Sequence, residues 1–173
     1  VAQDTLLRIG TMAVEPMLNY LSTHSGASTV TALSVAAGLR DPRFLEPAIA
    51  LGRDGSAQVR SLAANVIGVL GGGEAVNLLT ELLADPHAVV RATAARSLGQ
   101  LGYWPSAVSL APLLNDDVWE TRRDAAFALR RLDSPGILIL RRAVSDGEPR
   151  ASAIARQVLD LPDTEEAASS TRL

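Results

Sequence analysis

Residues 85–102 read DPHAVVRATAARSLGQLG, and versions of this stretch recur along the chain. An aspartate and, six positions later, an arginine return with a spacing of 31 residues: Asp54 and Arg60, Asp85 and Arg91, Asp116 and Arg122. A fixed period of this length is typical of stacked helical arrays, in which each unit buries its apolar face only against its neighbours. Such a fold produces a long, regular surface rather than a pocket built around chemistry.

A pair of alanines recurs at the same period, at 63–64, 94–95 and 125–126. Adjacent alanines followed by Leu or Ile three positions on give a helical apolar stripe, whose small members allow another helix to come close. Gly71 and Gly102 follow two of these stripes, as glycine does where the chain turns left-handed after a helix. We therefore predict a long second helix in each unit.

First helices are predicted between the second ones, at 13–21, 44–52, 75–84, 106–115 and 137–145. Pro16 and Pro47 fall in opening turns, where a missing N–H is harmless, whereas Pro112 lies late in its helix and predicts a kink or an early end. The predicted fold is all-α, a right-handed α-solenoid (alpha-alpha superhelix) of about five helix pairs.

Composition supports this fold and sets limits on function. Aromatic residues make up only 3% of the chain, and its apolar residues are mostly Ala, Leu and Val, which suit closely packed helices. The absence of cysteine excludes disulfides and cysteine zinc sites, which makes the cytoplasm the expected location. No apolar run approaches the roughly 18 to 20 residues that a membrane span needs. All sixteen basic residues are arginines and the net charge is −3, which argues against an extended nucleic-acid footprint.

Units of about 30 residues whose second helix reads Asp-Pro-x-x-x-Val-Arg-x-x-Ala-Ala-x-x-Leu-Gly-x-Leu-Gly resemble HEAT repeats, specifically the short type associated with phycobilisome lyase subunits. The resemblance covers roughly residues 3 to 161. It implies a polar ladder in which each arginine reaches an aspartate of its own or the adjacent unit. An aspartate at a helix N-cap would also accept free N–H groups. We interpret six residues as this structural ladder: Asp54, Arg60, Asp85, Arg91, Asp116 and Arg122.

The chain begins without Met, in residues typical of the end of a helix, so we expect a repeat domain over 1–161 that is truncated at its N-terminal end. Residues 162–173 are predicted to be a disordered tail. An uncapped repeat end would leave an apolar face, so a dimer of this chain would be an artefact of the truncation. We expect the domain to belong to a larger bacterial protein.

Function is expected in positions that vary between units. The resemblance implies that second helices line the concave face, where Asn65, Arg96 and Phe127 form one row and Val69, Gln100 and Arg131 form another. Aromatic and arginine side chains supply much of the energy of protein interfaces, although a core contact is an equal alternative for Phe127. The candidate partner-binding residues are Arg96, Gln100, Trp119, Arg123, Phe127, Arg130 and Arg131.

Catalytic and cofactor sites are not indicated. His24 and His87 lack a following glutamate, so the His-Glu iron pairs of HEAT-repeat deoxyhypusine hydroxylases are absent. No cysteine and no histidine beside a nucleophile form a credible catalytic set. The glycines at 71–73 lack the Lys-Ser/Thr of a phosphate loop. We therefore predict no enzyme activity, no cofactor and no metal.

The predicted function is a non-enzymatic protein-interaction or scaffold module that binds another protein or peptide on its concave face. One alternative is a nucleic-acid-binding relative of HEAT-like DNA glycosylases, because arginines and aromatic residues crowd the C-terminal half. Asp116, Asp117, Glu120 and Asp124 in the same stretch oppose it. The other alternative is an accessory subunit of a lyase-type enzyme.

Overall fold

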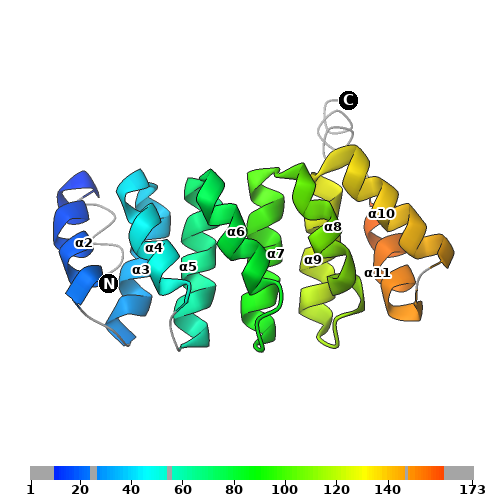
Figure 1. Ribbon diagram of the computed structural model, residues 1–173, viewed down its shortest axis with the longest axis horizontal. Helices are drawn as coiled ribbons and strands as arrows, with labels where there is room; N and C mark the ends of the chain where they lie inside the picture. The colour runs from blue at the N-terminus through cyan, green and yellow to red at the C-terminus, as the bar shows by residue number, and fades with distance from the viewer. Residues whose placement is uncertain (1–9, 24–26, 54–55, 147, 162–173) are drawn as a thin grey trace, which may run out of the picture.

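The chain forms a row of paired helices in the computed structural model, which describes residues 10–23, 27–53, 56–146 and 148–161 (Figure 1). The first helices of the pairs are α2 (Val14–Thr23), α4 (Leu45–Leu51), α6 (Gly73–Leu82), α8 (Ala107–Leu110) and α10 (Asp133–Asp146). The second helices are α3 (Ala27–Leu39), α5 (Ala57–Leu70), α7 (Ala88–Leu101), α9 (Trp119–Arg131) and α11 (Pro149–Leu159). Short 3-10 helices cover Gly10–Ala13, Pro42–Phe44, Trp104–Ser106 and Ala111–Asn115. The all-α solenoid is confirmed, with five helix pairs in the described part of the chain.

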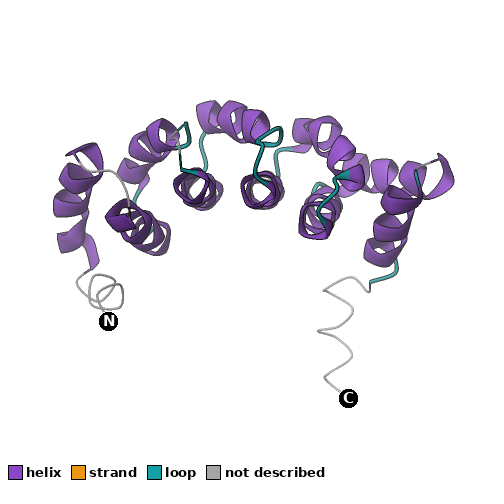
Figure 2. Cartoon of the chain, turned by 90° about the horizontal axis from the view of Figure 1, so that it is seen from below, coloured by secondary structure: helices purple, strands orange, loops and turns teal. Residues whose placement is uncertain are grey.

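The pairs are arranged in an arc of two layers (Figure 2). Helices α3, α5, α7, α9 and α11 form the inner layer, so the second helices line the concave side. Helices α4, α6, α8 and α10 lie in the outer, convex layer. The surface that the repeat presents inside the arc therefore consists of the second helices, as expected.

Two first helices depart from simple repetition. Helix α8 ends at Leu110 and continues as a 3-10 helix over Ala111–Asn115, as Pro112 predicts, because proline cannot donate the N–H that an α-helix needs. Helix α10 begins at Asp133, four residues before the predicted start, and follows α9 almost directly. This early start brings α10 close to α9. A Cβ on Gly136 would lie 1.7 Å from the carbonyl oxygen of Leu129.

A left-handed backbone recurs just after four second helices, directly after α3, α5 and α7 and one residue later after α9. Arg40, Gly71, Gly102 and Asp133 have φ values of 54°, 80°, 64° and 55°, and they lie 31 residues apart. Glycine adopts this conformation without steric cost, whereas arginine and aspartate do not. The turn is therefore dictated by the fold even in units whose sequence does not favour it.

Adjacent second helices pack against each other through small residues. A Cβ on Gly68 of α5 would lie 2.9 Å from the Cα of Ser97 in α7, and one on Gly99 of α7 would lie 2.6 Å from the Cα of Ala128 in α9. Gly68 and Gly99 are 31 residues apart, as are Ser97 and Ala128. The Ala-Ala pairs of these three helices are fully buried beside them. One close helix contact is thus used twice.

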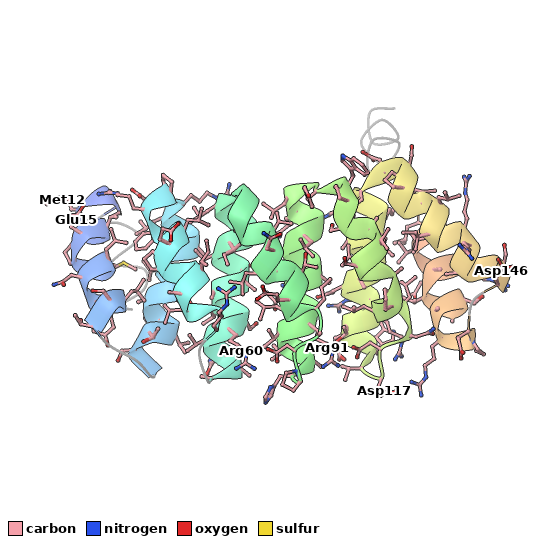
Figure 3. The ribbon with its side chains drawn as sticks, viewed as in Figure 1. Met12, Glu15, Arg60, Arg91, Asp117 and Asp146 are labelled. Carbon is pink, nitrogen blue, oxygen red and sulfur yellow. The ribbon has the colours of Figure 1, made fainter. Side chains whose placement is uncertain are left out.

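Arginine–aspartate pairs join neighbouring units along one edge of the solenoid, where Arg60 and Arg91 lie (Figure 3). The Arg60 guanidinium donates from Nε and Nη2 to the two carboxylate oxygens of Asp85 at 2.7 and 2.9 Å. Arg91 binds Asp116 with the same geometry and the same two distances. Each arginine therefore pairs with the aspartate of the following unit, a forked contact that fixes the orientation of both side chains.

The arginines also bind the turn that precedes their own helix. Nη1 of Arg91 donates to the carbonyl oxygen of Asp85 at 2.8 Å, and Nη1 of Arg122 donates to that of Asp116 at 2.6 Å. Among described residues Arg122 has no carboxylate partner, and its printed hydrogen bonds go to the carbonyl oxygens of Asp116 and Asp117. Asp54 lies outside the described residues.

The prediction that the aspartates are N-cap residues was wrong. The N-cap of α7 is His87 and that of α9 is Val118, and each aspartate lies two positions earlier. The carboxylate of Asp85 accepts the N–H of His87 at 2.8 Å, and that of Asp116 accepts the N–H of Val118 at 2.8 Å. Burial opposes ionisation of both carboxyl groups, yet these N–H groups and the paired guanidinium hold the pKa of each below its usual value.

Candidate functional site

Four of the predicted partner-binding residues form one stripe along α9. Trp119, Arg123, Phe127 and Arg131 are spaced by four positions, which places them on one face of the helix. The two aromatic side chains are 45% and 40% exposed, and Arg131 is exposed as well. We call these four residues the α9 stripe.

Apart from Arg96, the same register positions hold small or uncharged residues in the neighbouring units. They are Ala57, Ser61, Asn65 and Val69 in α5, and Ala88, Ala92, Arg96 and Gln100 in α7. Side-chain size and positive charge therefore increase from α5 to α9 along the concave face. Trp119, Phe127 and Arg131 of the α9 stripe are therefore departures from the repeat at positions where α5 has small or uncharged residues.

A buried carboxylate fixes two of the candidate arginines. The Asp124 side chain is 7% exposed, and its Oδ1 accepts from Nε and Nη2 of Arg123 at 2.9 and 2.7 Å. Its Oδ2 accepts from Nε and Nη2 of Arg96 at 3.2 and 2.8 Å. Since Arg96 comes from α7, this three-residue cluster ties α7 to α9. The Arg123 guanidinium also lies 5.1 Å from the ring centre of Trp119, a cation–π distance.

The sequence did not indicate this role of Asp124. Spacing alone does not say which of the acidic residues at 116, 117, 120 and 124 points inward. Arg96 and Arg123 remain 48% and 38% exposed at the side chain, so each still reaches the surface after pairing. They combine a structural contact with an exposed edge.

A small hollow between α7 and α9 brings four candidates together. Arg96, Gln100, Phe127 and Arg131 line it, together with Asp124 and Ala128, and its volume is about 200 Å³. Among described residues the Arg131 guanidinium has no hydrogen-bond or ion-pair partner. The hollow is therefore an arginine-lined depression with one aromatic wall.

A second, open groove begins on the other side of Phe127 and Arg131. Its apolar lining includes Ile137 and Leu138 from α10 and Leu159 from α11, and Arg141 adds a further guanidinium. Trp119, at the opposite end of the α9 stripe, faces a hollow of about 340 Å³ between α9 and α11. The stripe is thus bordered by depressions along its length.

The C-terminal groove opens where the close packing of second helices stops. Arg130 occupies the register position of Gly68 and Gly99. In α11, whose buried residues follow those of α9 by 30 positions, Val158 occupies the position of Ser97 and Ala128. Two large residues cannot interdigitate as glycine and alanine do, and α11 packs more extensively against α10 than against α9.

Arg130 lies apart from the exposed stripe. Its guanidinium donates to the carbonyl oxygen of Val158, and Nη2 donates to that of Leu161 at 2.7 Å. These carbonyls lie at the C-terminal end of α11, where a positive charge is favourable. Arg130 therefore connects α9 to α11. Trp104, in contrast, is 67% exposed and is not buried between units.

The described residues form neither a metal site nor a membrane-spanning helix. Within those ranges no three His, Cys, Asp or Glu side chains are grouped so that they could hold a metal ion. In the same part of the chain, no helix combines the length and the apolar character needed to cross a bilayer. What the geometry offers is a surface of guanidinium and aromatic groups, which suits binding.

Comparisons with known proteins agree with the fold. Residues 45–130 match the family model for HEAT repeats. An engineered protein aligns with a TM-score of 0.60 at 17% identity, covering 86% of this chain and 78% of that one. A designed armadillo repeat protein in complex with the peptide (KR)4 aligns with a TM-score of 0.59 at 18% identity, covering 91% and 84%. Human deoxyhypusine hydroxylase in complex with glycerol aligns with a TM-score of only 0.48 at 17% identity, covering 86% of this chain and 73% of that one. No curated protein matches the sequence.

Proposed function

We propose that this chain, whose residues 45–130 match HEAT repeats, is a non-enzymatic interaction module that holds another protein on its concave face. Repeats of this fold commonly mediate protein interactions because stacking produces a continuous surface rather than an enclosed pocket. We place the module in the cytoplasm as part of the same proposal.

The observation that carries the proposal is the α9 stripe between its flanking depressions. Trp and Arg are the side chains that most often dominate the energy of protein interfaces, especially beside pockets that exclude water. The stripe adds three such residues and a phenylalanine at positions where α5 has only small or uncharged ones. The peptide complex of the designed armadillo relative supports the idea that a solenoid of similar shape can hold an extended chain.

The test replaces Phe127 and Arg131 together by alanine and leaves Arg123 in place, because Arg123 satisfies the buried Asp124. A partner captured by the wild-type chain is identified, purified and titrated against each variant. We expect the double variant to bind about 30-fold more weakly or worse, as expected for loss of interface hot spots. Its helical content by circular dichroism should not change.

The matched control replaces Asn65 and Val69 by alanine, which alters the same two rows on α5. This control should bind the partner like the wild type. Equal binding by the wild type and the Phe127/Arg131 double variant would rule out the α9 stripe as the interaction site.

Neither alternative function gains a specific observation. Binding of nucleic acid is opposed by the carboxylates of Asp124 and Asp133, which lie among the arginines of the candidate surface and would repel phosphates. For an accessory lyase subunit, activity would have to appear only with a second chain. The interaction module remains the function that the geometry favours.

A further inference from the structure

We infer that the partner is recognised through an acidic segment, and that one carboxylate side chain of this segment enters the hollow between α7 and α9 and pairs with Arg131. The inference rests on the proposed function and specifies the chemistry of its ligand. Three features carry it: the surplus of positive charge around Asp124, the Arg131 guanidinium that pairs with none of the described residues, and the size of the hollow.

The cluster around Asp124 carries more positive than negative charge. One carboxylate with both oxygens occupied faces two guanidinium groups. Each of these guanidinium groups uses Nε and Nη2 on Asp124, so Nη1 of Arg96 and of Arg123 remains available within the described part of the chain. Asp124 therefore orients two arginines without cancelling them, and a second carboxylate would complete the arrangement.

Arg131 supplies the group that such a carboxylate would bind. Its guanidinium is exposed, lines the hollow and pairs with none of the described residues. A fork of N–H donors fits a carboxylate with two parallel hydrogen bonds, and the ring of Phe127 beside it reduces competition from water. Arg131 needs no rearrangement of the stack to accept a ligand.

The hollow is large enough for a side chain but not for a folded segment. Its volume of about 200 Å³ is that of a few water molecules in the liquid. The remainder of the segment would run over Phe127 toward the neighbouring groove, where Leu138 is 69% exposed and Arg141 adds a second positive charge. The ligand therefore combines a carboxylate with an apolar neighbour.

A nucleic acid fits the same surface less well. A phosphate backbone requires a row of cations along its path, and the equivalent row of α5, at 57, 61, 65 and 69, has no charge. The chain as a whole carries a net charge of −3, so the positive region is local. A single strong anchor suits a carboxylate side chain better than a polyanion.

Fluorescence anisotropy with labelled octapeptides tests the inference on the full chain. The probes alternate glutamate with leucine or glutamine with leucine, and a labelled DNA duplex is the third probe. We expect the glutamate peptide to bind at least 10-fold more tightly than the glutamine peptide at 0.15 M salt. Arg131→Gln should abolish most of this preference.

Arg142→Gln is the matched control, because Arg142 is also exposed, has no ion-pair partner among described residues and lines none of the three depressions. This substitution should weaken binding of the glutamate peptide less than 3-fold. Equal weakening by both variants, equal binding of both peptides, or tighter binding of the duplex would overturn the inference.

The two proposals fail in different ways. If the Phe127/Arg131 double variant loses the captured partner but the glutamate peptide neither binds nor competes, the interaction site stands and the acidic ligand is wrong. If the peptide binds through Arg131 while the double variant retains the partner, the proposed function at this site is wrong.

Discussion

The two central junctions of the solenoid and its last junction use the same register positions for opposite purposes. Between α5 and α7, and again between α7 and α9, glycine meets a small residue and an arginine pairs with the next aspartate. Between α9 and α11, Arg130 and Val158 replace the small residues, and within the described ranges Arg122 binds only carbonyl oxygens. A position that closes the stack in one place thus opens a groove in another.

This difference shows where a repeat protein can acquire function without losing its fold. The central junctions need small residues and paired charges, so substitutions there act on stability. At the junction of α9 with α11 the close glycine contact is already absent, so larger side chains do not obstruct it. Larger and charged residues can accumulate there, and the α9 stripe lies at this boundary.

The largest effect should follow loss of a central arginine–aspartate pair. Asp116→Ala removes the acceptor of Arg91, whose side chain is only 18% exposed, and that of the Val118 N–H. We expect the free energy of unfolding to fall by about 3 kcal/mol, because a poorly exposed guanidinium loses its carboxylate. Urea denaturation followed by circular dichroism measures this.

The adjacent Asp117 is the control, since its carboxylate is 93% exposed and pairs with the exposed Arg150. Asp117→Ala should change the free energy of unfolding by less than about 0.5 kcal/mol. Similar losses for the two variants would contradict the distinction between a central pair and a surface pair.

The same pair predicts a dependence on acid. The folded state lowers the pKa of Asp116 below that of the unfolded chain, so its contribution to stability is complete above pH about 5 and decreases as the pH falls through the folded pKa. The difference in unfolding free energy between wild type and Asp116→Ala should therefore be constant from pH 5 to 8 and shrink below pH about 4. A difference that grows in acid would contradict this assignment.

A smaller loss is expected when the close helix contact is obstructed. Gly99→Ala places a Cβ against the backbone of Ala128, so α7 and α9 must move apart, and we expect a loss of about 2 kcal/mol. Gly73→Ala is the control, because no atom lies within 4 Å of its Cβ position and its backbone is not left-handed. Thermal melts should separate the two variants by several degrees, and coincident melts would contradict the close contact.

Arg130 should matter less, because the last junction is not closed by packing. Arg130→Ala removes the donors to the carbonyls of Val158 and Leu161 and should cost about 1 to 2 kcal/mol. Hydrogen exchange should rise in α11 but not in α5. Uniform acceleration along the chain would show that Arg130 does not act locally.

The smallest effect concerns the turns after the second helices. Arg40→Gly should raise the free energy of unfolding by about 0.5 to 1 kcal/mol because glycine relieves the left-handed backbone, whereas Gly102→Ala should lower it by about 1 kcal/mol. No atom lies within 4 Å of the Cβ position of Gly102, so backbone conformation alone is tested there. Denaturant melts should shift in opposite directions for the two variants.

Recurrence in the sequence was sufficient to predict the stack. The period of 31 residues specified the helix pairs, and the terminating role of Gly71 and Gly102 followed from their position after an apolar stripe. The sequence could also have predicted the early start of α10. Pro135 suits a first helical turn, and Asp133 tolerates a left-handed backbone better than most residues.

The candidate surface was only partly predictable, because its geometry depends on contacts between units. Spacing placed the α9 stripe on one face, but it did not show that Asp124 is buried between Arg96 and Arg123. Alignment of Arg130 with Gly68 and Gly99 would have indicated that a close-packing position had changed. The spacing of residues within one helix does not show which residues of the neighbouring helix they contact. These contacts between units could therefore be identified only from the structure.

The repeated junction also makes the molecule extendable. The surface that α7 offers to α5 is nearly the same as the one that α9 offers to α7, down to the glycine contact and the forked ion pair. A duplicate of residues 88–118 placed between these helices would therefore find matching neighbours on both sides. The number of units can therefore change while the α9 stripe and its flanking depressions stay as they are.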